Sequence, residues 1–270
     1  MIVSPHIPFL YAGLDFATGP ARKAFALGIA VTLGFTPATT RAAFHSWEVA
    51  EVYSNPDGTV QFIELRALVG GQQNLGSFSA SVTSTNSSGS TTFTCTTNLP
   101  SDSANKTCLL GTAALASTPG GVAPNYIIPN GFVRTPVGGG NAAVIFNPNS
   151  GASVFYASLP TDGDSALLRS GTSTVTVPTN SPRNFFNQSN AIVPVKFLTS
   201  QSSGGNFIVT FRTATGTNGT AGPNYAVETN NVVGSVNWST VSNVAGNGTT
   251  KTVAFPLTPA TNKFFRLRVP

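Results

Sequence analysis

Short apolar runs that alternate with polar residues follow one another along most of this chain. Residues 47–53 (WEVAEVY) and 59–66 (TVQFIELR) are two such runs, and Asn55-Pro56-Asp57-Gly58 separates them. Alternation with a period of two is typical of a half-buried β-strand. An Asp-Gly pair between two alternating runs is a strong signal for a β-hairpin. The sequence therefore predicts that the first two strands pair antiparallel.

Similar runs recur over the rest of the chain, with Gly, Pro, Ser, Thr and Asn between them. Strands are expected at 76–83, 90–95, 108–112, 126–128, 142–146 and 153–157, and after residue 192 at 196–199, 206–213, 224–229, 236–241, 250–255 and 263–269. Residues 113–117 are expected to form one helical turn. Many short strands at this spacing suit a sandwich or a barrel, so the predicted fold class is all-β.

The pattern also predicts two β-sandwich domains, 43–191 and 192–270. Residues 178–188 are rich in turn formers and contain Phe185 and Phe186, so we expect a packed closing loop there. The second domain has no cysteine and needs a core of its own. Its expected core residues are Phe207, Phe211, Tyr225, Trp238, Phe255, Phe264 and Phe265.

The start of the chain has the pattern of a signal peptide. Arg22 and Lys23 precede a run of 12 apolar residues, 24–35, which is too short to span a bilayer. Pro37 interrupts any helix, and we expect cleavage before Ala43. The alternative is a buried core helix. The predicted signal peptide is residues 1–42, and the mature protein is expected to be secreted or held at the cell surface, with no membrane span.

Composition narrows the possible chemistry. Charged residues make up only 9% of the chain, against about 25% in an average globular protein. The net charge is +5, but the basic residues are scattered, which argues against nucleic-acid binding. The two histidines are His6 and His45, too few for a Ser-His-Asp triad or a zinc site in the mature chain. We therefore expect no catalytic residue, no metal and no cofactor.

The two cysteines, Cys95 and Cys108, have 12 residues between them. In an exported chain the expected state is a disulfide, here between two strands thought to be adjacent. Closing a loop of this size contributes about 3 kcal/mol in the chain-entropy model. The alternative, a metal pair, lacks other Cys or His ligands nearby.

Glu51 and Glu64 lie in the first two predicted strands. A two-residue turn places Glu51 opposite Glu64, whereas a four-residue turn places it opposite Phe62. We expect both carboxylates to have a structural role, ionised and accepting backbone N–H groups. The alternatives are a calcium site and the acid pair of a glycosidase. Asp162 and Asp164 are expected to belong to an ordinary turn, with calcium binding again the alternative.

Two resemblances bear on the fold. Residues 48–65 (EVAEVYSNPDGTVQFIEL) resemble the opening of lamin-tail-like domains, in which Glu51 and Ile63-Glu64-Leu65 match the pattern. Residues 159–163 and 180–188 are similar to a group of uncharacterised secreted proteins with that opening, so the likeness extends over about 44–190. It implies an immunoglobulin-like β-sandwich.

The tail is similar to a C-terminal β-sandwich common in secreted bacterial proteins. The matching residues are Tyr225-Ala226-Val227-Glu228, Trp238, Gly246-Asn247-Gly248 and Phe264-Phe265-Arg266-Leu267-Arg268. Neither resemblance implies a catalytic residue, because fold likeness does not set function.

The expected function is a non-enzymatic secreted or cell-surface module, binding or structural, whose partner is an unknown protein or polysaccharide. One alternative is a carbohydrate-binding module that stacks Trp47 or Trp238 on sugars. Another is a secreted hydrolase that uses a carboxylate pair. Six Asn-x-Ser/Thr sequons occur and matter only in a glycosylating host: Asn86, Asn105, Asn187, Asn218, Asn237 and Asn247.

Overall fold

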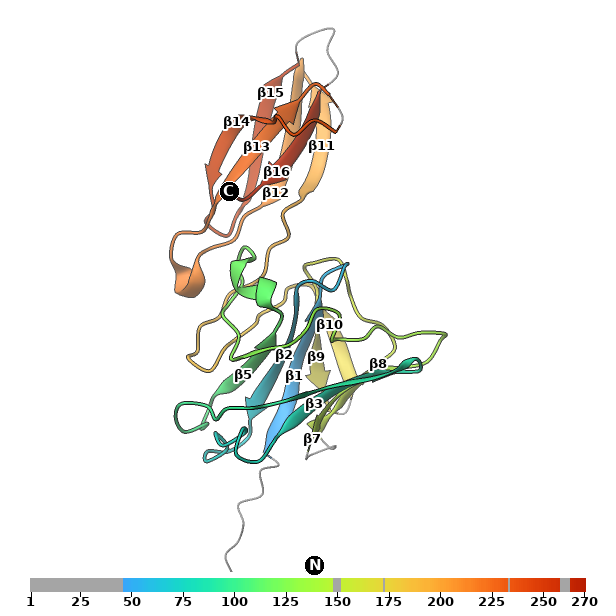
Figure 1. Cartoon of the computed structure of the whole chain (residues 1–270). Helices are drawn as coiled ribbons and strands as arrows, with labels where there is room; N and C mark the ends of the chain where they lie inside the picture. The colour runs from blue at the N-terminus through green and yellow to red at the C-terminus, as the bar shows by residue number, and fades with distance from the viewer. Residues whose placement is uncertain (1–45, 148–151, 172, 233, 258–262) are drawn as a thin grey trace, which may run out of the picture. The chain divides into compact units, whose positions relative to one another are not determined.

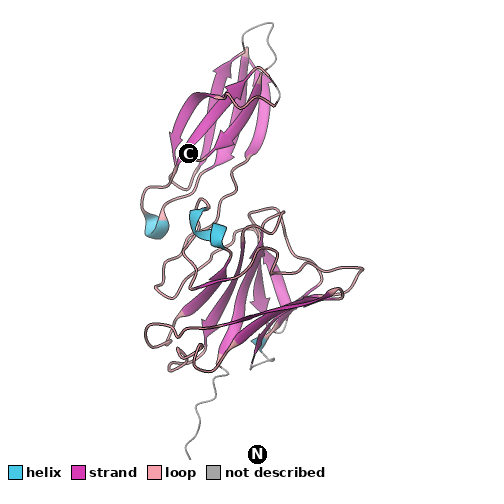
Figure 2. Ribbon diagram, in the orientation of Figure 1, coloured by secondary structure: helices cyan, strands magenta, loops and turns pink. Residues whose placement is uncertain are grey.

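A computed structural model describes residues 46–270, except 148–151, 172, 233 and 258–262. The predicted signal peptide and its cleavage point lie outside the described residues and stay predictions. Strands dominate what is described, and the labelled helical elements there are short 3₁₀ turns (Figure 2). The predicted all-β fold class is confirmed.

Six strands form one sheet in the order β10-β9-β1-β2-β5-β6 (Figure 1). Neighbours are antiparallel except for the parallel pair β5–β6. Its strands are β1 (Trp47–Ser54), β2 (Gln61–Ala67), β5 (Thr107–Gly111), β6 (Tyr126–Ile127), β9 (Ala166–Ser170) and β10 (Ser173–Val177). A second sheet has the order β4-β3-β7-β8, with β3 (Ser81–Asn86), β4 (Gly89–Thr94), β7 (Ala142–Asn147) and β8 (Val154–Tyr156).

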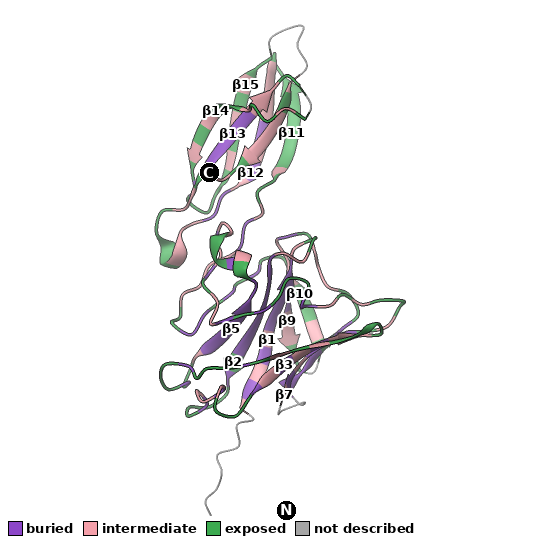
Figure 3. Cartoon of the chain, in the orientation of Figure 1, coloured by how far each residue is buried: buried purple, intermediate pink, exposed green. Residues whose placement is uncertain are grey.

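These two sheets share one hydrophobic core. Trp47 and Leu65 of the first sheet lie in the same buried cluster as Val82, Phe146 and Tyr156 of the second. The most deeply buried strands are β1, β2 and β5 (Figure 3). Two sheets that bury facing side chains in this way are consistent with a β-sandwich.

A β-bulge explains why the alternation in β1 is imperfect. The register of β1 against β2 shifts between Val49 and Glu51. The extra residue, Ala50, lets Val49 and Val52 both enter the shared core although they are three positions apart. Beyond the bulge Glu51 lies opposite Glu64, which is the first of the two registers considered from the sequence.

Long connections cover the other face of the six-stranded sheet. Tyr53 and Phe62 stack there, with ring centroids 5.1 Å apart. They belong to a second buried cluster with Leu115 of the 3₁₀ turn η1 (Ala113–Ser117) and with Ile192. Both faces of β1 and β2 are therefore buried, one by the second sheet and the other by loops.

The remaining strands form two three-stranded antiparallel sheets, ordered β11-β12-β15 and β14-β13-β16. They are β11 (Phe197–Ser203), β12 (Asn206–Arg212), β13 (Asn224–Asn230), β14 (Ser239–Ala245), β15 (Thr250–Pro256) and β16 (Phe264–Arg268). Phe265 joins the two sheets, since its ring lies 4.5 Å from that of Phe207 and 5.5 Å from that of Phe255. No described sheet has strands on both sides of residue 192. The division into two domains at that residue stays a prediction.

Most expected strands are present, although several bounds and one expected core residue differ. The hairpin of β9 and β10 was not predicted from the sequence. β3 begins at Ser81 because residues 76–79 form turns, and β14 begins three residues later than expected. In the expected C-terminal core, Phe264 is exposed, because inward positions on β16 are taken by Phe265 and Leu267.

The structure does not support the predicted disulfide. Cys95 and Cys108 are both free and buried. They do not lie on adjacent strands: Cys95 follows β4 in the four-stranded sheet, whereas Cys108 lies in β5 of the six-stranded sheet. Both thiols instead fill space in the shared core, as free buried cysteine commonly does.

Burial should control the reactivity of these thiols. It raises the pKa of Cys95 to about 12 and raises that of Cys108 as well. Since the thiolate is the reactive form, we expect neither thiol to react with an alkylating reagent in the native protein, and both to react in denaturant. Mass spectrometry after labelling measures this. Two thiols that stay unlabelled in denaturant without reductant would indicate a disulfide.

Leu65 and Leu68 offer a matched test of the shared core. Leu65 is fully buried, whereas Leu68, just beyond the end of β2, is 54% exposed. We expect Leu65→Ala to lower the free energy of unfolding by about 2–5 kcal/mol, because it leaves a cavity. Leu68→Ala should change it by less than about 0.5 kcal/mol. Urea unfolding measures both, and equal losses would contradict the assigned core.

Candidate functional site

Two carboxyl groups lie side by side on the loop-covered face of the six-stranded sheet. Glu51 of β1 and Glu64 of β2 are directly opposite each other in the register, and only 2% and 9% of their surfaces are exposed. Residues directly opposite in an antiparallel pair have Cβ atoms about 4.5–5.5 Å apart. The strands therefore hold two acids close together in a mostly buried environment.

The loop after β10 supplies hydrogen-bond donors to both carboxyl groups. The backbone N–H and the hydroxyl of Ser181 donate to Oε1 and Oε2 of Glu51, each at 2.8 Å. The backbone N–H of Arg183 donates to Oε2 of Glu64 at 2.7 Å. Both oxygens of Glu51 are thus engaged, and the two acids fix this loop against the sheet.

The same loop is fastened at further points. The hydroxyl of Thr107 donates to the carbonyl oxygens of Arg183 and Asn184, at 2.9 and 3.2 Å. Oδ1 of Asn125 accepts the backbone N–H of Phe185 at 3.0 Å. Phe185 is buried in the shared core, whereas Phe186 is exposed, so the expectation of a packed closing loop holds for the first of the two rings.

Burial shifts the pKa of both acids upward. For Glu51 the main cause is burial, and the bonds from Ser181 act in the opposite direction. For Glu64, burial and the neighbouring charge of Glu51 raise the pKa to about 8. Glu64 therefore carries a proton at neutral pH. The sequence leads us to expect both carboxylates to be ionised; for Glu64, burial and then the charge of Glu51 favour the protonated form.

Two arginines and a third acid lie next to the pair. Glu48 forms ion pairs with Arg66 and with Nε of Arg169, the latter at 3.2 Å. Nη1 of Arg169 also donates to the carbonyl oxygens of Ala152 and Ser153, at 2.7 and 2.9 Å. A pocket of about 200 Å³ is lined by Glu51, Glu64, Arg66, Arg169, Ser181, Ala50 and Leu168.

The chemistry open to this site is limited by its hydrogen bonds. Two acids of which one holds a proton can serve as a general acid and a base or nucleophile in glycoside hydrolysis. Here, however, both oxygens of Glu51 accept hydrogen bonds from Ser181, so this carboxylate serves to hold the loop. No group of three potential metal-ligating side chains occurs among the described residues.

Asp162 and Asp164 have separate partners. Oδ1 of Asp162 accepts the backbone N–H groups of Asp164 and Ser165, at 2.9 and 2.7 Å, as in an ordinary Asx turn. The carboxylate of Asp164 pairs with Lys196 at 3.2 Å and with Arg212 at 2.8 Å. The structure does not bring these two acids together with Glu51 and Glu64.

The tail contains a second buried acid with cationic partners. Glu228 of β13 accepts hydrogen bonds from Nε of Arg266 at 2.6 Å and of Arg268 at 3.2 Å, and the bond from Arg266 is the main cause of its lowered pKa. Arg266 also lies over the ring of Trp238, 4.4 Å from its centroid. The two arginines that the sequence places two positions apart thus bind one carboxylate.

Of the two tryptophans considered for sugar stacking, Trp47 is not available. Trp47 is fully buried and donates its indole N–H to the carbonyl oxygen of Gln72 at 2.9 Å. One face of Trp238 is occupied by the guanidinium of Arg266. Stacking on a sugar needs a free aromatic face, which Trp47 lacks.

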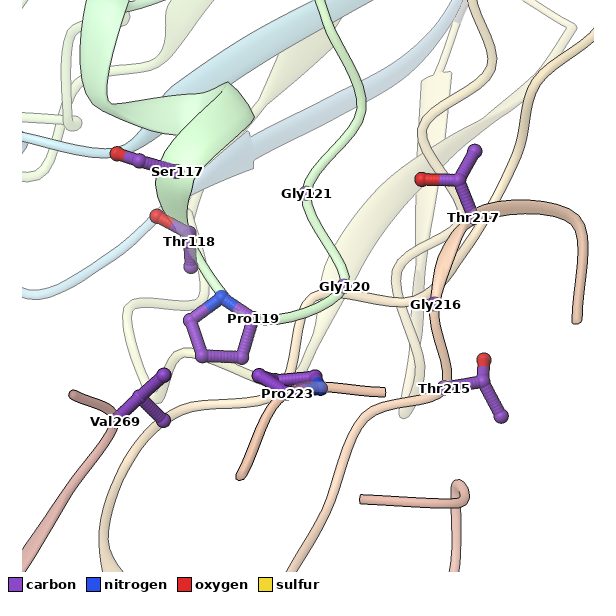
Figure 4. Close-up of a pocket in the computed structure, with 10 residues that line it drawn as sticks. All are labelled: Ser117, Thr118, Pro119, Gly120, Gly121, Thr215, Gly216, Thr217, Pro223 and Val269. Carbon is purple, nitrogen blue, oxygen red and sulfur yellow. The ribbon is translucent and has the colours of Figure 1, made fainter. Parts of the chain in front are cut away.

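Another pocket, of about 160 Å³, has little functional chemistry (Figure 4). Its walls carry hydroxyl, aliphatic and proline groups and backbone, with no ionisable side chain: Ser117, Thr118, Pro119, Gly120, Gly121, Thr215, Gly216, Thr217, Pro223 and Val269. Separately, within the described ranges, no helix has the length and apolar character needed to cross a membrane.

Sequence reasoning found Glu51 and Glu64 but missed the groups that bind them. Ser181 lies 130 positions from Glu51, and Arg183 lies 119 positions from Glu64. The contribution of Arg183 is a backbone N–H, which every residue except proline has. No local pattern in the sequence could have identified this pairing.

Comparison with known proteins adds no relative. No protein-family model matches this chain, and no curated protein shows significant similarity to it. The resemblance to lamin-tail-like domains therefore stays a prediction from residues 48–65.

Glu64→Gln tests the raised pKa. The pKa of Glu64 is about 8 in the folded protein, against 4.5 for an ordinary carboxyl group. The folded state thus binds more protons over this interval, so wild-type stability should fall as pH rises from about 4.5 to 8. Glutamine keeps the shape without a titrating proton. Each pKa unit corresponds to about 1.4 kcal/mol. The free energy of unfolding of the variant, relative to that of wild type, should therefore rise by at least that much from pH 5 to pH 8.5.

Urea unfolding at these two pH values measures the difference, with Asp102→Asn as a control at an exposed acid. Parallel pH dependence in wild type and Glu64→Gln would mean that Glu64 has an ordinary pKa.

Proposed function

We propose that this chain is a non-enzymatic module, binding or structural, that acts in a secreted or surface-attached state. The observation that carries the proposal is that the carboxylate of Glu51 binds a loop of the protein itself. Both of its oxygens accept hydrogen bonds from Ser181, so the most deeply buried acid pair holds a loop against the sheet. A hydrolase would need at least one of these oxygens directed at a substrate.

The organisation of the sheets supports a display role. The fold consists of β-sheets joined by polar loops, and the chain has only 9% charged residues. We further propose that the two groups of sheets are two immunoglobulin-like domains. Two observations support this division. No described sheet extends across residue 192, and the buried core clusters separate at nearly the same place.

An activity assay with insoluble polysaccharides tests the proposal. Full-length protein is incubated with chitin, cellulose and peptidoglycan, and both sedimentation and release of reducing sugar are measured. We expect no sugar release by wild type, and equal sedimentation of wild type and Glu64→Gln. Thermal melting shows that the variant is folded. Sugar release by wild type that is lost in folded Glu64→Gln would overturn the proposal and favour the hydrolase.

Export is tested by the mass of the secreted protein. If residues 1–42 are a signal peptide, protein recovered from the medium or the cell surface of the native host begins at Ala43. Retention of the full chain inside the cell would contradict this part of the proposal.

A further inference from the structure

A polar pocket of about 300 Å³ lies where the β1–β2 hairpin meets the loop that precedes β7. From the hairpin, Asn55, Asp57 and Gly58 line it, and from the loop Arg134 and Thr135. The two segments are joined by a backbone bond from the N–H of Gly131 to the carbonyl oxygen of Gly58, at 3.0 Å. The volume lies at the lower end of the range for ligand pockets, so it suits one small polar unit.

Buried side chains hold the loop of this pocket in place. Gln61, which is 2% exposed, bonds both the N–H and the carbonyl oxygen of Val133, each at 2.9 Å. The next residue, Arg134, is fixed in the same way, because its N–H donates to the hydroxyl of Ser84 at 2.9 Å and its carbonyl oxygen accepts the hydroxyl of Tyr156 at 2.8 Å. A binding residue anchored by buried partners is pre-organised.

Arg134 is a half-buried cation without an acidic partner. Its Nη2 donates to the hydroxyl of Thr91 at 2.8 Å, and its Nε is buried with no hydrogen-bond partner. Among the described arginines, those that pair with a carboxylate are Arg66, Arg169, Arg212, Arg266 and Arg268. Arg134 differs from them, and from the exposed Arg183, in being half-buried in a pocket and unpaired. With Nε buried and one N–H of Nη2 bonded to Thr91, Nη1 and the second N–H of Nη2 remain to bind a planar carboxylate end-on.

Other polar groups of the pocket suit hydroxyl groups. Oδ1 of Asp57 accepts the N–H and the hydroxyl of Thr59, at 3.0 and 2.6 Å, and these bonds lower the pKa of Asp57. Asp57 is therefore ionised at neutral pH, although it forms no ion pair with Arg134. A ligand of this pocket needs an acidic group for Arg134 and hydroxyl groups that can donate to Asp57.

We infer that this pocket binds a carboxylate-bearing sugar residue of an acidic polysaccharide. The carboxylate of the sugar pairs with Arg134, and its ring hydroxyls bond to Asp57 and to the neighbouring hydroxyl and amide groups. This goes beyond the proposed function, which names no ligand, and it does not involve the pocket beside Glu51 and Glu64.

Binding of full-length protein to polygalacturonate, measured by calorimetry in the presence of a chelator, tests the inference. The matched ligand is the methyl-esterified polymer, which keeps the hydroxyl groups and loses the charge. We expect the esterified polymer to bind at least about tenfold more weakly, a difference of about 1.4 kcal/mol. Equal binding of the two polymers, or no binding of polygalacturonate, would overturn the inference.

Three variants separate a site from general attraction between charges. Arg134→Gln should weaken binding about tenfold or more, whereas Arg183→Gln, at an exposed arginine without an ion pair, should leave it unchanged. Asp57→Asn should weaken binding if Asp57 accepts sugar hydroxyls. Thermal melting of each variant confirms that it is folded.

Two outcomes with the variants would reject the inference. An equal effect of Arg134→Gln and Arg183→Gln would mean that only net charge attracts the polymer. Tighter binding by Asp57→Asn would mean that the pocket takes simple anions and not sugars. Neither outcome affects the hydrolysis assay, so the proposed function is judged separately.

Discussion

The structure depends on one constraint: loops, and not a second sheet, bury one face of the six-stranded sheet. β1 and β2 have a buried side chain at nearly every position, and on the loop-covered face these include Glu51 and Glu64. Burying a carboxyl group without partners is costly, and burying two opposite each other is more so. The loop donors at Ser181 and Arg183, together with a proton kept on Glu64, make this arrangement stable.

The same need for partners explains why uncharged polar side chains organise so much of this protein. With few charges available, loops are fixed by buried amides and hydroxyls that bond the backbone. Asn180 bonds Asp164 and Ile192, and Gln61 bonds Val133. Such bonds are directional. Leaving a buried polar group without its partner lowers the free energy of unfolding by about 1–3 kcal/mol. These loops are consequently defined in position although they lack regular structure.

Six of the described basic side chains share three acids, and one of these pairs joins Arg212 of β12 to Asp164 in the connection before β9. Glu48 holds two arginines beside the acid pair, and Glu228 holds two on the tail. Against this background an unpaired, half-buried arginine such as Arg134 is conspicuous. Its position follows from the buried residues around it and not from its own charge.

The sequence by itself determined the all-β class, the hairpin at Asp57-Gly58 and most strand positions, because a period of two and turn residues are local signals. It also placed Glu51 opposite Glu64 as one of two registers. The folded hairpin has the first of these registers from Ser54 to Glu51, with the bulge at Ala50 following it, and tertiary structure placed Cys95 and Cys108 on different sheets. Tertiary structure also raised the pKa of Glu64 and left Arg134 without an acidic partner. The first property depends on burial and on the adjacent Glu51, and the second on how the chain folds around Arg134, whose guanidinium donates to Thr91, 43 positions away. No local pattern contains either.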